Sequence, residues 1–383
     1  MKIVIVCDVL GEENNGTTIA AMNLKRSLEA RGHQVRMLCP DADRAGQPGY
    51  DIVPTRDLGP FNGYVRKNGV VLAQPKDRII KAAIEGADVV HVMMPFGLGR
   101  RAAHLAKQAG IPVSAGFHAM AENITVHFFL KNAGPANRLA YRYFAGLYRQ
   151  CDAIHYPTQF LRDLYEGLYG PTNGYVISNG VHPDIHPVTA QKPAVFAGRT
   201  VILFTGRYSG EKSHRVLIQA VERSAYREQI QLIFAGEGPL KEQLQREAAV
   251  LPLPPVFSFF TRAEMVQILN YADLYVHPAE IEAEGVACLE AIACGLVPVI
   301  SNSPRCATQA YAMDERNLFQ YDSPANLAGK IDWWISHPEA RAERSRAYLA
   351  YAREQFDQEV CMDKMERMLR ETAAKRNSGA AHS

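Results

Sequence analysis

Short runs of consecutive apolar residues alternate with amphipathic stretches along most of the chain. The first run, residues 2–8 (Lys-Ile-Val-Ile-Val-Cys-Asp), is apolar at successive positions, which is typical of a parallel strand buried on both faces. A loop rich in Gly and Asn follows at 11–16, and then a helical pattern runs from Ile19 to Leu28 and ends at Gly32. The next apolar run, Gln34 to Cys39, completes the order strand, loop, helix, strand of a βαβ unit.

The same alternation continues to about residue 177, stops, and then starts again. Residues 186–200 contain two Pro and one Gly and show no periodicity, so we expect a linker there. Further strands are expected at 88–93, 112–116, 152–156 and 175–177 before the linker, and at 201–205, 231–235, 274–276 and 297–301 after it. Helices are expected at 100–109, 213–221, 240–249, 261–271, 285–293, 324–336 and 338–355.

This order predicts an α/β protein with two doubly wound, Rossmann-like parallel-sheet domains that face a central cleft. Open parallel sheets bind ligands at the carboxyl ends of their strands, so we expect the site in that cleft. The tail from Ala373 to Ser383 is small and polar, and we expect it to be disordered. The expected boundaries are an N-terminal domain at 1–186, a linker at 187–200, a C-terminal domain at 201–360, and a C-terminal helix with its disordered tail at 361–383.

Composition narrows the class of protein. A chain of 383 residues is too long for one ordinary core, which agrees with two domains. The 42 Lys and Arg nearly balance the 40 Asp and Glu, so a dedicated nucleic-acid binder is not expected. No apolar run reaches the roughly 18–20 residues that span a bilayer, the first run is too short for a signal peptide, and the seven cysteines are scattered. We therefore expect a cytoplasmic protein with free thiols.

Two carboxylates and a glycine lie close together in the stretch 277–301. Glu282 lies in the loop before a predicted helix, Glu290 lies on that helix, and Gly285 lies near its start. The free backbone N–H groups and the dipole at such a start can hold an anion, and a glycine lets a ligand approach the backbone. The alternative is an ordinary helix start enriched in acidic residues.

A second group of residues follows the predicted strand 201–205. Gly206, Arg207 and Lys212 lie beyond the carboxyl end of this strand, where a parallel sheet binds its ligand. Two fixed cations at this place would stabilise a negatively charged group through charge-assisted hydrogen bonds. The alternative is a solvated Arg and Lys in a loop.

The stretch 277–301 resembles the signature of retaining glycosyltransferases of family 4, which have the GT-B fold. The family pattern is Glu-x-Phe-Gly, a helix with a second Glu, then Ala-x-Ala-x-Gly and Pro-Val. Glu284 stands at the Phe position, and one more residue than in the pattern separates Gly295 from Pro298. The remaining matches are Glu282, Gly285, Glu290, Ala291, Ala293, Val299, the turn Gly236-Glu-Gly-Pro239 and the segment Asn179-Gly180-Val181.

The resemblance implies that the C-terminal domain binds a nucleotide-sugar donor, and that the N-terminal domain binds the acceptor. Arg207 and Lys212 would bind the donor diphosphate, Glu282 the sugar hydroxyls, and Glu290 the ribose. The two cations would stabilise the departing diphosphate, so no metal and no cofactor are expected. The other implied donor-binding positions are Gly16, Gly206, Gly236, Arg262, Gly285 and Val286, of which Arg262 could instead belong only to a helix cap.

The resemblance also implies a reaction and a set of residues in the N-terminal domain. The departing phosphate oxygen would help to deprotonate the incoming hydroxyl on the same face of the sugar. His118, at the end of a predicted strand, would lie near the sugar ring and join Arg207, Lys212 and Glu282 as catalytic residues. The alternative for His118 is a core histidine. The acceptor side would include Thr17, Glu122 and Asn123.

The acceptor is expected to be a membrane lipid. Residues 101–150 carry six Lys and Arg against one Glu, interleaved with aromatic residues, and a basic amphipathic segment of this kind suits an anionic membrane surface, here through 125–150. An ordinary helix that packs its aromatics in the core is the alternative. Residues 101–150 also resemble bacterial enzymes that glucosylate diacylglycerol. We therefore expect a UDP-hexose donor, a diacylglycerol acceptor and a peripheral position on the membrane. A soluble or polyprenyl-linked glycan acceptor, a sugar-nucleotide epimerase or hydrolase, and a two-domain binding protein without chemistry remain alternatives.

Overall fold

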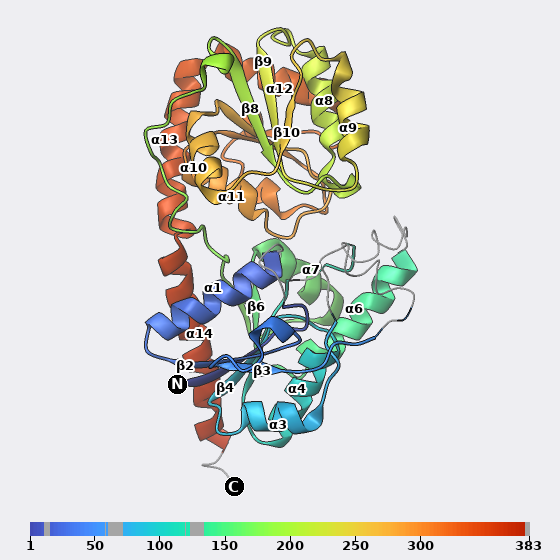
Figure 1. Cartoon of the computed structure of the whole chain (residues 1–383), viewed down its shortest axis with the longest axis vertical. Helices are drawn as coiled ribbons and strands as arrows, with labels where there is room; N and C mark the ends of the chain where they lie inside the picture. Colours follow the sequence, from blue (N-terminus) through green and yellow to red (C-terminus); the bar gives the residue numbers. More distant parts are fainter. Residues whose placement is uncertain (11–15, 58, 60–71, 119, 123–133, 380–383) are drawn as a thin grey trace. The chain divides into compact units, whose positions relative to one another are not determined.

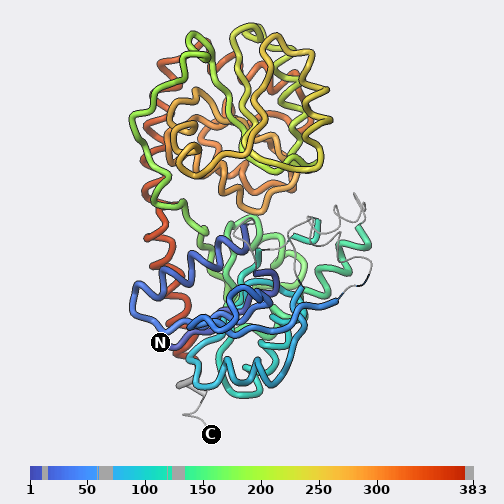
Figure 2. The backbone as a smooth tube through the Cα atoms, viewed as in Figure 1, coloured from blue at the N-terminus to red at the C-terminus, as the bar shows by residue number. Residues whose placement is uncertain are grey.

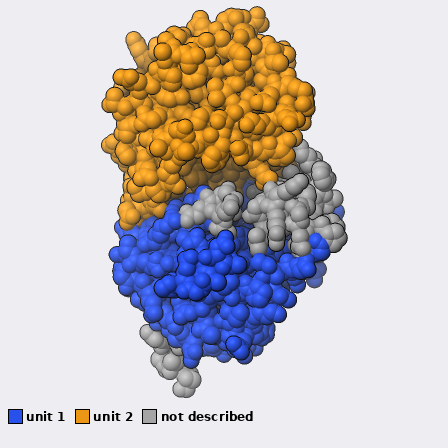
Figure 3. Space-filling model, viewed as in Figure 1, with its two compact units in different colours: residues 1–179, 361–383 blue, residues 180–360 orange. Residues whose placement is uncertain are grey.

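The structure, a computed structural model, describes residues 1–10, 16–57, 59, 72–118, 120–122 and 134–379, with only the backbone given for 376–379. The chain divides into two compact units (Figure 3). Unit 1 contains Met1–Asn179 together with Cys361–Ser383, and unit 2 contains Gly180–Val360. Unit 1 is therefore built from both ends of the chain.

Unit 1 contains a seven-stranded sheet in the order β3-β2-β1-β4-β5-β6-β7, in which every pair is parallel. The strands at its centre are buried except at Lys2, because the sequence is apolar at consecutive positions and helices cover the sheet. The strands are β1 (Lys2–Val6), β2 (Gln34–Cys39), β3 (Tyr50–Ile52), β4 (Val89–Val92), β5 (Val113–Gly116), β6 (Ala153–Tyr156) and β7 (Gly174–Val176).

The helices of unit 1 connect these strands in the doubly wound manner (Figure 1). Asp8, just after β1, is buried and accepts hydrogen bonds from the backbone N–H groups of Leu98 and Gly99 in the first turn of α4, at 2.7 and 2.9 Å. The helices are α1 (Gly16–Ala30), α3 (Asp77–Ile84), α4 (Gly97–Gln108), α6 (Gly134–Tyr148), α7 (Gln159–Tyr169) and, from the far end of the chain, α14 (Gln358–Gly379).

Unit 2 contains a six-stranded parallel sheet in the order β10-β9-β8-β11-β12-β13. Its three central strands β9, β8 and β11 end at the same edge, and the loops that follow them carry the predicted donor motifs. The strands are β8 (Thr200–Thr205), β9 (Ile230–Ala235), β10 (Val256–Ser258), β11 (Leu274–His277), β12 (Pro298–Ser301) and β13 (Leu318–Phe319).

The helices of unit 2 cover its sheet, with α8 packed against α9 and α12, and α11 packed against α13 (Figure 1). The structure confirms the helix expected at 261–271, and a capping box of Thr261 and Glu264 begins it as α10. The helices are α8 (His214–Arg223), α9 (Lys241–Glu247), α10 (Arg262–Tyr271), α11 (Val286–Ala293), α12 (Pro324–Ser336) and α13 (Pro338–Gln355).

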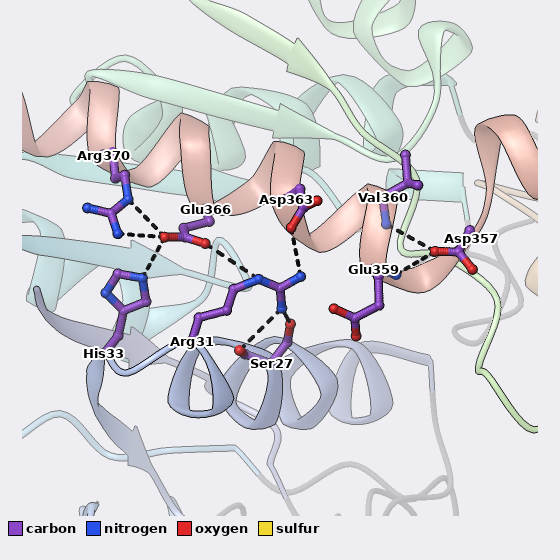
Figure 4. Close-up of polar contacts among 9 residues, drawn as sticks. All are labelled: Ser27, Arg31, His33, Asp357, Glu359, Val360, Asp363, Glu366 and Arg370. Atoms are coloured by element: carbon purple, nitrogen blue, oxygen red, sulfur yellow. Dashed lines mark hydrogen bonds and ion pairs between the residues drawn. The ribbon is translucent and has the colours of Figure 1, made fainter.

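The C-terminal helix α14 packs beside the start of the chain (Figure 2). Asp357 accepts hydrogen bonds from the N–H groups of Glu359 and Val360 and so caps the helix at its start. Further along, Glu366 lies 2.9 Å from Nε2 of His33, and Arg31 donates to Asp363 at 2.8 Å (Figure 4). These polar contacts hold the last helix of the chain on α1 and β2.

The predicted fold class is confirmed: both units are α/β and contain a Rossmann-like parallel sheet. The expectation of a disordered tail from Ala373 is wrong for residues 373–379, which form the last turns of α14. Thr372 is buried in unit 1, and Lys375 donates a hydrogen bond to the Asp152 carbonyl at 2.7 Å, so this helix is anchored on unit 1. Residues 380–383 lie outside the described residues. In the part of the chain that is described, no helix is long and apolar enough to cross a membrane.

Candidate active site

Lys212 and Glu282 meet at the carboxyl edge of the unit 2 sheet. Lys212 ends a short 3-10 helix (Gly210–Lys212) that follows β8, and its ammonium donates a hydrogen bond to Oε2 of Glu282. The Glu282 backbone is fixed on both sides, because its N–H donates to Arg305 and its carbonyl accepts from Ala307, at 3.1 and 2.8 Å. Two predicted site residues from distant parts of the sequence thus form one ion pair.

The charged state of this pair is stable inside the protein. Burial raises the pKa of a carboxyl group, but Lys212 and His277 outweigh burial and hold the pKa of Glu282 well below its ordinary value. Burial likewise opposes the ammonium of Lys212, and Glu282 overcomes it and raises the lysine pKa. A fixed cation beside a fixed anion therefore faces any ligand that enters this edge of unit 2.

Glycines allow two backbone segments to lie close together next to this pair. A Cβ atom on Gly236 would lie 2.1 Å from the Gly206 carbonyl oxygen, and one on Gly238 would lie 2.5 Å from the Tyr208 carbonyl oxygen. The Gly206 N–H in turn donates to the Ala235 carbonyl at 3.0 Å. The turn after β9 therefore supports the segment after β8, from which Arg207 and Lys212 project.

Helix α11 begins directly beside Glu282. Its N-cap residue is Gly285, which has a left-handed backbone (φ 75°), and a Cβ atom there would lie 2.2 Å from Cγ2 of Thr308. Val286 is the first helical residue, so its N–H and those after it point out of the helix start. Glu284, at the position where the family pattern has Phe, is buried, and its carbonyl accepts a hydrogen bond from Tyr311 at 2.8 Å.

Glu290 lies on α11 and has a different electrostatic environment from Glu282. Burial raises its pKa to about 7, and Arg262 at the start of α10 opposes this rise only in part. A carboxyl group with such a pKa can accept a hydrogen bond as a carboxylate or donate one as an acid. Both roles suit contact with a diol.

His118 lies in unit 1, after β5, and turns back over its own strand. A Cβ atom on Gly116 would lie 2.3 Å from Nε2 of His118, so the glycine is what allows this conformation. The imidazole packs edge-on against His155, with 5.2 Å between the ring centroids, and His91 lies near both in a small cavity of about 10 Å³. One buried ring nitrogen of each of these three histidines has no hydrogen-bond partner among the described residues.

This histidine cluster predicts an acid-sensitive unit 1. Burial lowers the pKa of His91 to about 3 and that of His155 to about 4, so the folded protein holds both neutral while the unfolded chain protonates near pH 6.5. Stability is therefore lost as the pH falls below about 6.5. At pH 5 each such histidine lowers the free energy of unfolding by about 2 kcal/mol relative to its value at neutral pH. His155→Gln keeps a donor for the Ile177 carbonyl and cannot titrate, so its urea-unfolding stability should fall less between pH 7 and pH 5 than that of wild type.

Parallel stability profiles of wild type and His155→Gln would contradict this assignment. Taking the difference between the two proteins removes the contribution of Asp8. Burial raises the pKa of that carboxyl to about 7, and Asp8 therefore acts in the opposite direction as the pH falls.

The other predicted residues of unit 1 are spread over several elements. Gly16 and Thr17 begin α1, and the Thr17 hydroxyl lies 3.8 Å from Sδ of Met94. Glu122 accepts a hydrogen bond from Tyr141 of α6 at 2.5 Å. Asn123 lies outside the described residues, as do residues 125–133 of the expected basic segment.

His277 is the residue near the predicted site that the sequence reasoning missed. It ends β11, and its Nε2 lies 3.5 Å from Oε2 of Glu282. The signal available in the sequence was its position at the end of a buried strand, five residues before Glu282. A lone histidine in an apolar strand gives no indication of what it faces. Among the described residues, no group of three or more His, Cys, Asp or Glu is arranged to hold a metal ion.

Comparisons with known proteins find relatives among glycosyltransferases. The curated relatives include a GDP-mannose-dependent alpha-mannosyltransferase of Corynebacterium glutamicum, 24% identical over 78% of this chain and 72% of the relative. A phosphatidylinositol dimannoside mannosyltransferase of Mycobacterium tuberculosis is 23% identical over 90% of each chain, and an alpha-monoglucosyldiacylglycerol synthase of Acholeplasma laidlawii is 23% identical over 75% of this chain and 76% of that one.

Solved structures share the fold. Anabaena HepE in complex with UDP and glucose superimposes with a TM-score of 0.73 over 97% of this chain and 100% of that chain, at 16% identity. Sucrose-phosphate synthase from Thermosynechococcus elongatus superimposes with a TM-score of 0.74 over 98% of this chain and 100% of that chain, also at 16% identity. The family "Glycosyltransferase Family 4" matches residues 14–185, and "Glycosyl transferases group 1" matches 187–354. The chain therefore belongs to the family 4 and group 1 glycosyltransferases of the GT-B fold.

Proposed function

We propose that this glycosyltransferase moves a hexose from a nucleoside diphosphate to a hydroxyl of a membrane lipid, such as diacylglycerol, with retention of the anomeric configuration. The observation that carries the donor part is the Lys212–Glu282 ion pair beside the start of α11. It places a cation, a hydroxyl acceptor and free backbone N–H groups at one edge of the sheet. A sugar diphosphate needs these three partners.

Each donor group has a partner in this proposal. Lys212, Arg207 and the N–H groups at Gly285 and Val286 bind the diphosphate. The turns at Gly206 and Gly236 let the donor approach the backbone. The remaining contacts are Glu282 with the sugar hydroxyls, Glu290 with the ribose, Arg262 on the side of the base, and Gly16 from unit 1.

The proposed reaction is a displacement on one face of the sugar. The bond between the anomeric carbon and the phosphate oxygen breaks, the acceptor oxygen forms the new bond, and its proton passes to the departing phosphate oxygen. The negative charge that develops on the diphosphate is stabilised by Lys212 and Arg207, so the step requires no divalent metal. His118 completes the catalytic set on the acceptor side, with Thr17, Glu122 and Asn123 near the acceptor.

The base of the donor nucleotide is either uracil or guanine. The sequence favoured a UDP-hexose, and UDP is bound in the HepE structure, whereas two relatives are named for GDP-mannose. UDP-glucose is therefore the first donor to test, and GDP-mannose is the second.

Helix α6 supports a lipid acceptor at an anionic membrane surface. A groove of about 600 Å³ runs along it, lined by Arg138, Arg142 and Arg149 together with Leu139, Pro135, Ala145 and Tyr169. Leu139 is 70% exposed, and Leu168 on α7 is 50% exposed. Cationic side chains with exposed leucines beside them fit the headgroup region of a bilayer, with the apolar groups in contact with the acyl chains.

Arg138→Gln together with Arg142→Gln should weaken binding to vesicles. The wild-type protein is expected to sediment with phosphatidylglycerol vesicles at low salt and to be released at high salt. Each basic residue near such a surface contributes about 1 kcal/mol, so the double variant should bind roughly 30-fold more weakly. Arg223→Gln with Arg227→Gln, two exposed arginines of unit 2, is the matched control. Equal sedimentation of both double variants, or no binding by wild type at any salt, would refute the membrane assignment.

An activity screen of donors against acceptors tests the function as a whole. UDP-glucose and GDP-mannose are each incubated with diacylglycerol vesicles, with a soluble glycan, or with no acceptor, and the products are identified by mass spectrometry. Glycolipid formed only with vesicles supports the proposal. Transfer only to the glycan would overturn the lipid acceptor. Release or isomerisation of the sugar without an acceptor would indicate a hydrolase or an epimerase. Tight binding without turnover would indicate a binding protein.

A further inference from the structure

His277 is buried between the core of unit 2 and Glu282. Only 1% of the residue is exposed, and the imidazole stacks on Tyr275 with 6.0 Å between centroids and 26° between the ring planes. Its Nδ1 lies 3.3 Å from the Tyr275 hydroxyl, and its Nε2 lies 3.5 Å from Oε2 of Glu282. The ring therefore connects a buried hydroxyl to a site carboxylate.

Burial favours the neutral form of the imidazole, which has a single ring proton. Burial lowers the pKa of His277, and Glu282 offsets this only in part. The Tyr275 hydroxyl can donate its proton to Nδ1, and the ring N–H then lies on Nε2 and faces Glu282. At 3.5 Å Nε2 is in contact with Oε2 but makes no hydrogen bond of ordinary geometry to it, so its effect on Glu282 is mainly to orient the carboxylate.

Lys212 and His277 both contact the same carboxylate oxygen. The ammonium of Lys212 and Nε2 of His277 each approach Oε2, while no described residue donates a hydrogen bond to Oε1 of Glu282. The hydrogen bond from Lys212 and the contact with the imidazole hold this oxygen in place. Oε1 is left as the acceptor for a ligand.

We infer that His277 is a positioning residue that holds Glu282 so that Oε1 accepts a hydroxyl of the donor hexose. The inference rests on the proposed function, because it uses Glu282 as the sugar contact. His277 is not part of the donor motifs, so its expected effect is new. His277 should affect recognition of the sugar more than recognition of the nucleoside diphosphate, since Lys212 binds the diphosphate itself and keeps its own hydrogen bond to Oε2 when the imidazole is removed.

Three variants separate this role from packing. His277→Met fills the space without an N–H, His277→Gln keeps a donor near the place of Nε2, and Tyr275→Phe removes only the hydroxyl on Nδ1. His214→Met is the matched control, because His214 is also buried in unit 2 and packs on Phe204 at 4.6 Å but is absent from the contacts of Glu282. The readouts are kcat and KM for transfer, and binding of UDP-glucose and of UDP alone by calorimetry, with GDP-mannose and GDP in parallel.

His277→Met should lower kcat/KM and nucleotide-sugar affinity by about 5-fold, less than the loss of a full hydrogen bond to a charged group, while affinity for the free nucleoside diphosphate changes less than about 2-fold. His277→Gln should restore most of the loss, and Tyr275→Phe should show a smaller loss of the same kind. Equal losses for nucleotide and nucleotide sugar, a sugar-specific loss in His214→Met, or unchanged binding in both His277→Met and Tyr275→Phe would overturn the inference.

The binding readout keeps this inference separate from the proposed function. If wild type binds a nucleotide sugar without transferring it, the proposed transfer fails, and the comparison of sugar and nucleotide binding still decides the role of His277. If wild type binds neither nucleotide sugars nor nucleoside diphosphates, both are overturned.

Discussion

Lys212→Ala is expected to lower turnover by at least about 100-fold while the fold is retained. Lys212 is the cation that the structure places beside Glu282, and in the proposed reaction it faces the charge that develops on the leaving diphosphate. Removing one fixed donor of this kind typically costs about 2.7–4 kcal/mol of barrier. Steady-state kinetics with the donor and acceptor found in the screen measure the effect.

Two controls show whether the loss comes from this contact. Lys330→Ala removes a lysine that donates to the Glu315 carbonyl in the same unit, and its turnover should stay near wild type. The far-ultraviolet circular dichroism and melting temperature of Lys212→Ala should show that unit 2 remains folded. Turnover within a few-fold of wild type in a folded Lys212→Ala protein would refute the diphosphate role.

Gly236→Ala is expected to abolish donor binding and to destabilise unit 2 by more than about 2 kcal/mol. The backbone of Gly236 has φ 153°, which residues with a Cβ rarely adopt, and the added atom would lie 2.1 Å from the Gly206 carbonyl oxygen. The clash is with backbone and cannot be relieved by a side-chain rotation. The segment that carries Arg207 and Lys212 must therefore move.

Gly329→Ala is the matched control for this substitution. Gly329 lies in α12, and a Cβ atom there meets nothing within 4 Å, so alanine should leave stability unchanged or raise it by up to about 1 kcal/mol. Urea unfolding and nucleotide binding compare the two variants. Normal nucleotide binding by Gly236→Ala would show that the approach of the two turns does not support the site.

Much of the fold could be predicted because its signals are local. Buried parallel strands such as β1 and β8 are apolar at consecutive positions, and the start of α10 contains its capping box in four successive residues. The juxtaposition of Lys212 and Glu282, 70 residues apart, followed from a topological rule: both follow strands that end at the same edge of one sheet.

What the sequence did not predict depends on tertiary contacts. The orientation of His277 toward Glu282 is set by the packing of Tyr275 and Phe204 around its ring. The cluster of His91, His118 and His155 forms only because three strands lie side by side. Helix α14 is held on unit 1 by the hydrogen bonds of Glu371 with Tyr175 and of Lys375 with the Asp152 carbonyl, and the small, polar composition of the tail alone does not indicate a helix.

A crystal structure with a bound nucleoside diphosphate, grown in the presence of EDTA, tests the central claim most directly. We expect UDP or GDP to bind in unit 2 with its phosphate oxygens within hydrogen-bond distance of Lys212, Arg207 and the N–H groups at the start of α11, and with its ribose on Glu290. A diphosphate bound elsewhere, or one that requires a divalent metal to bind at this edge of the sheet, would contradict the account.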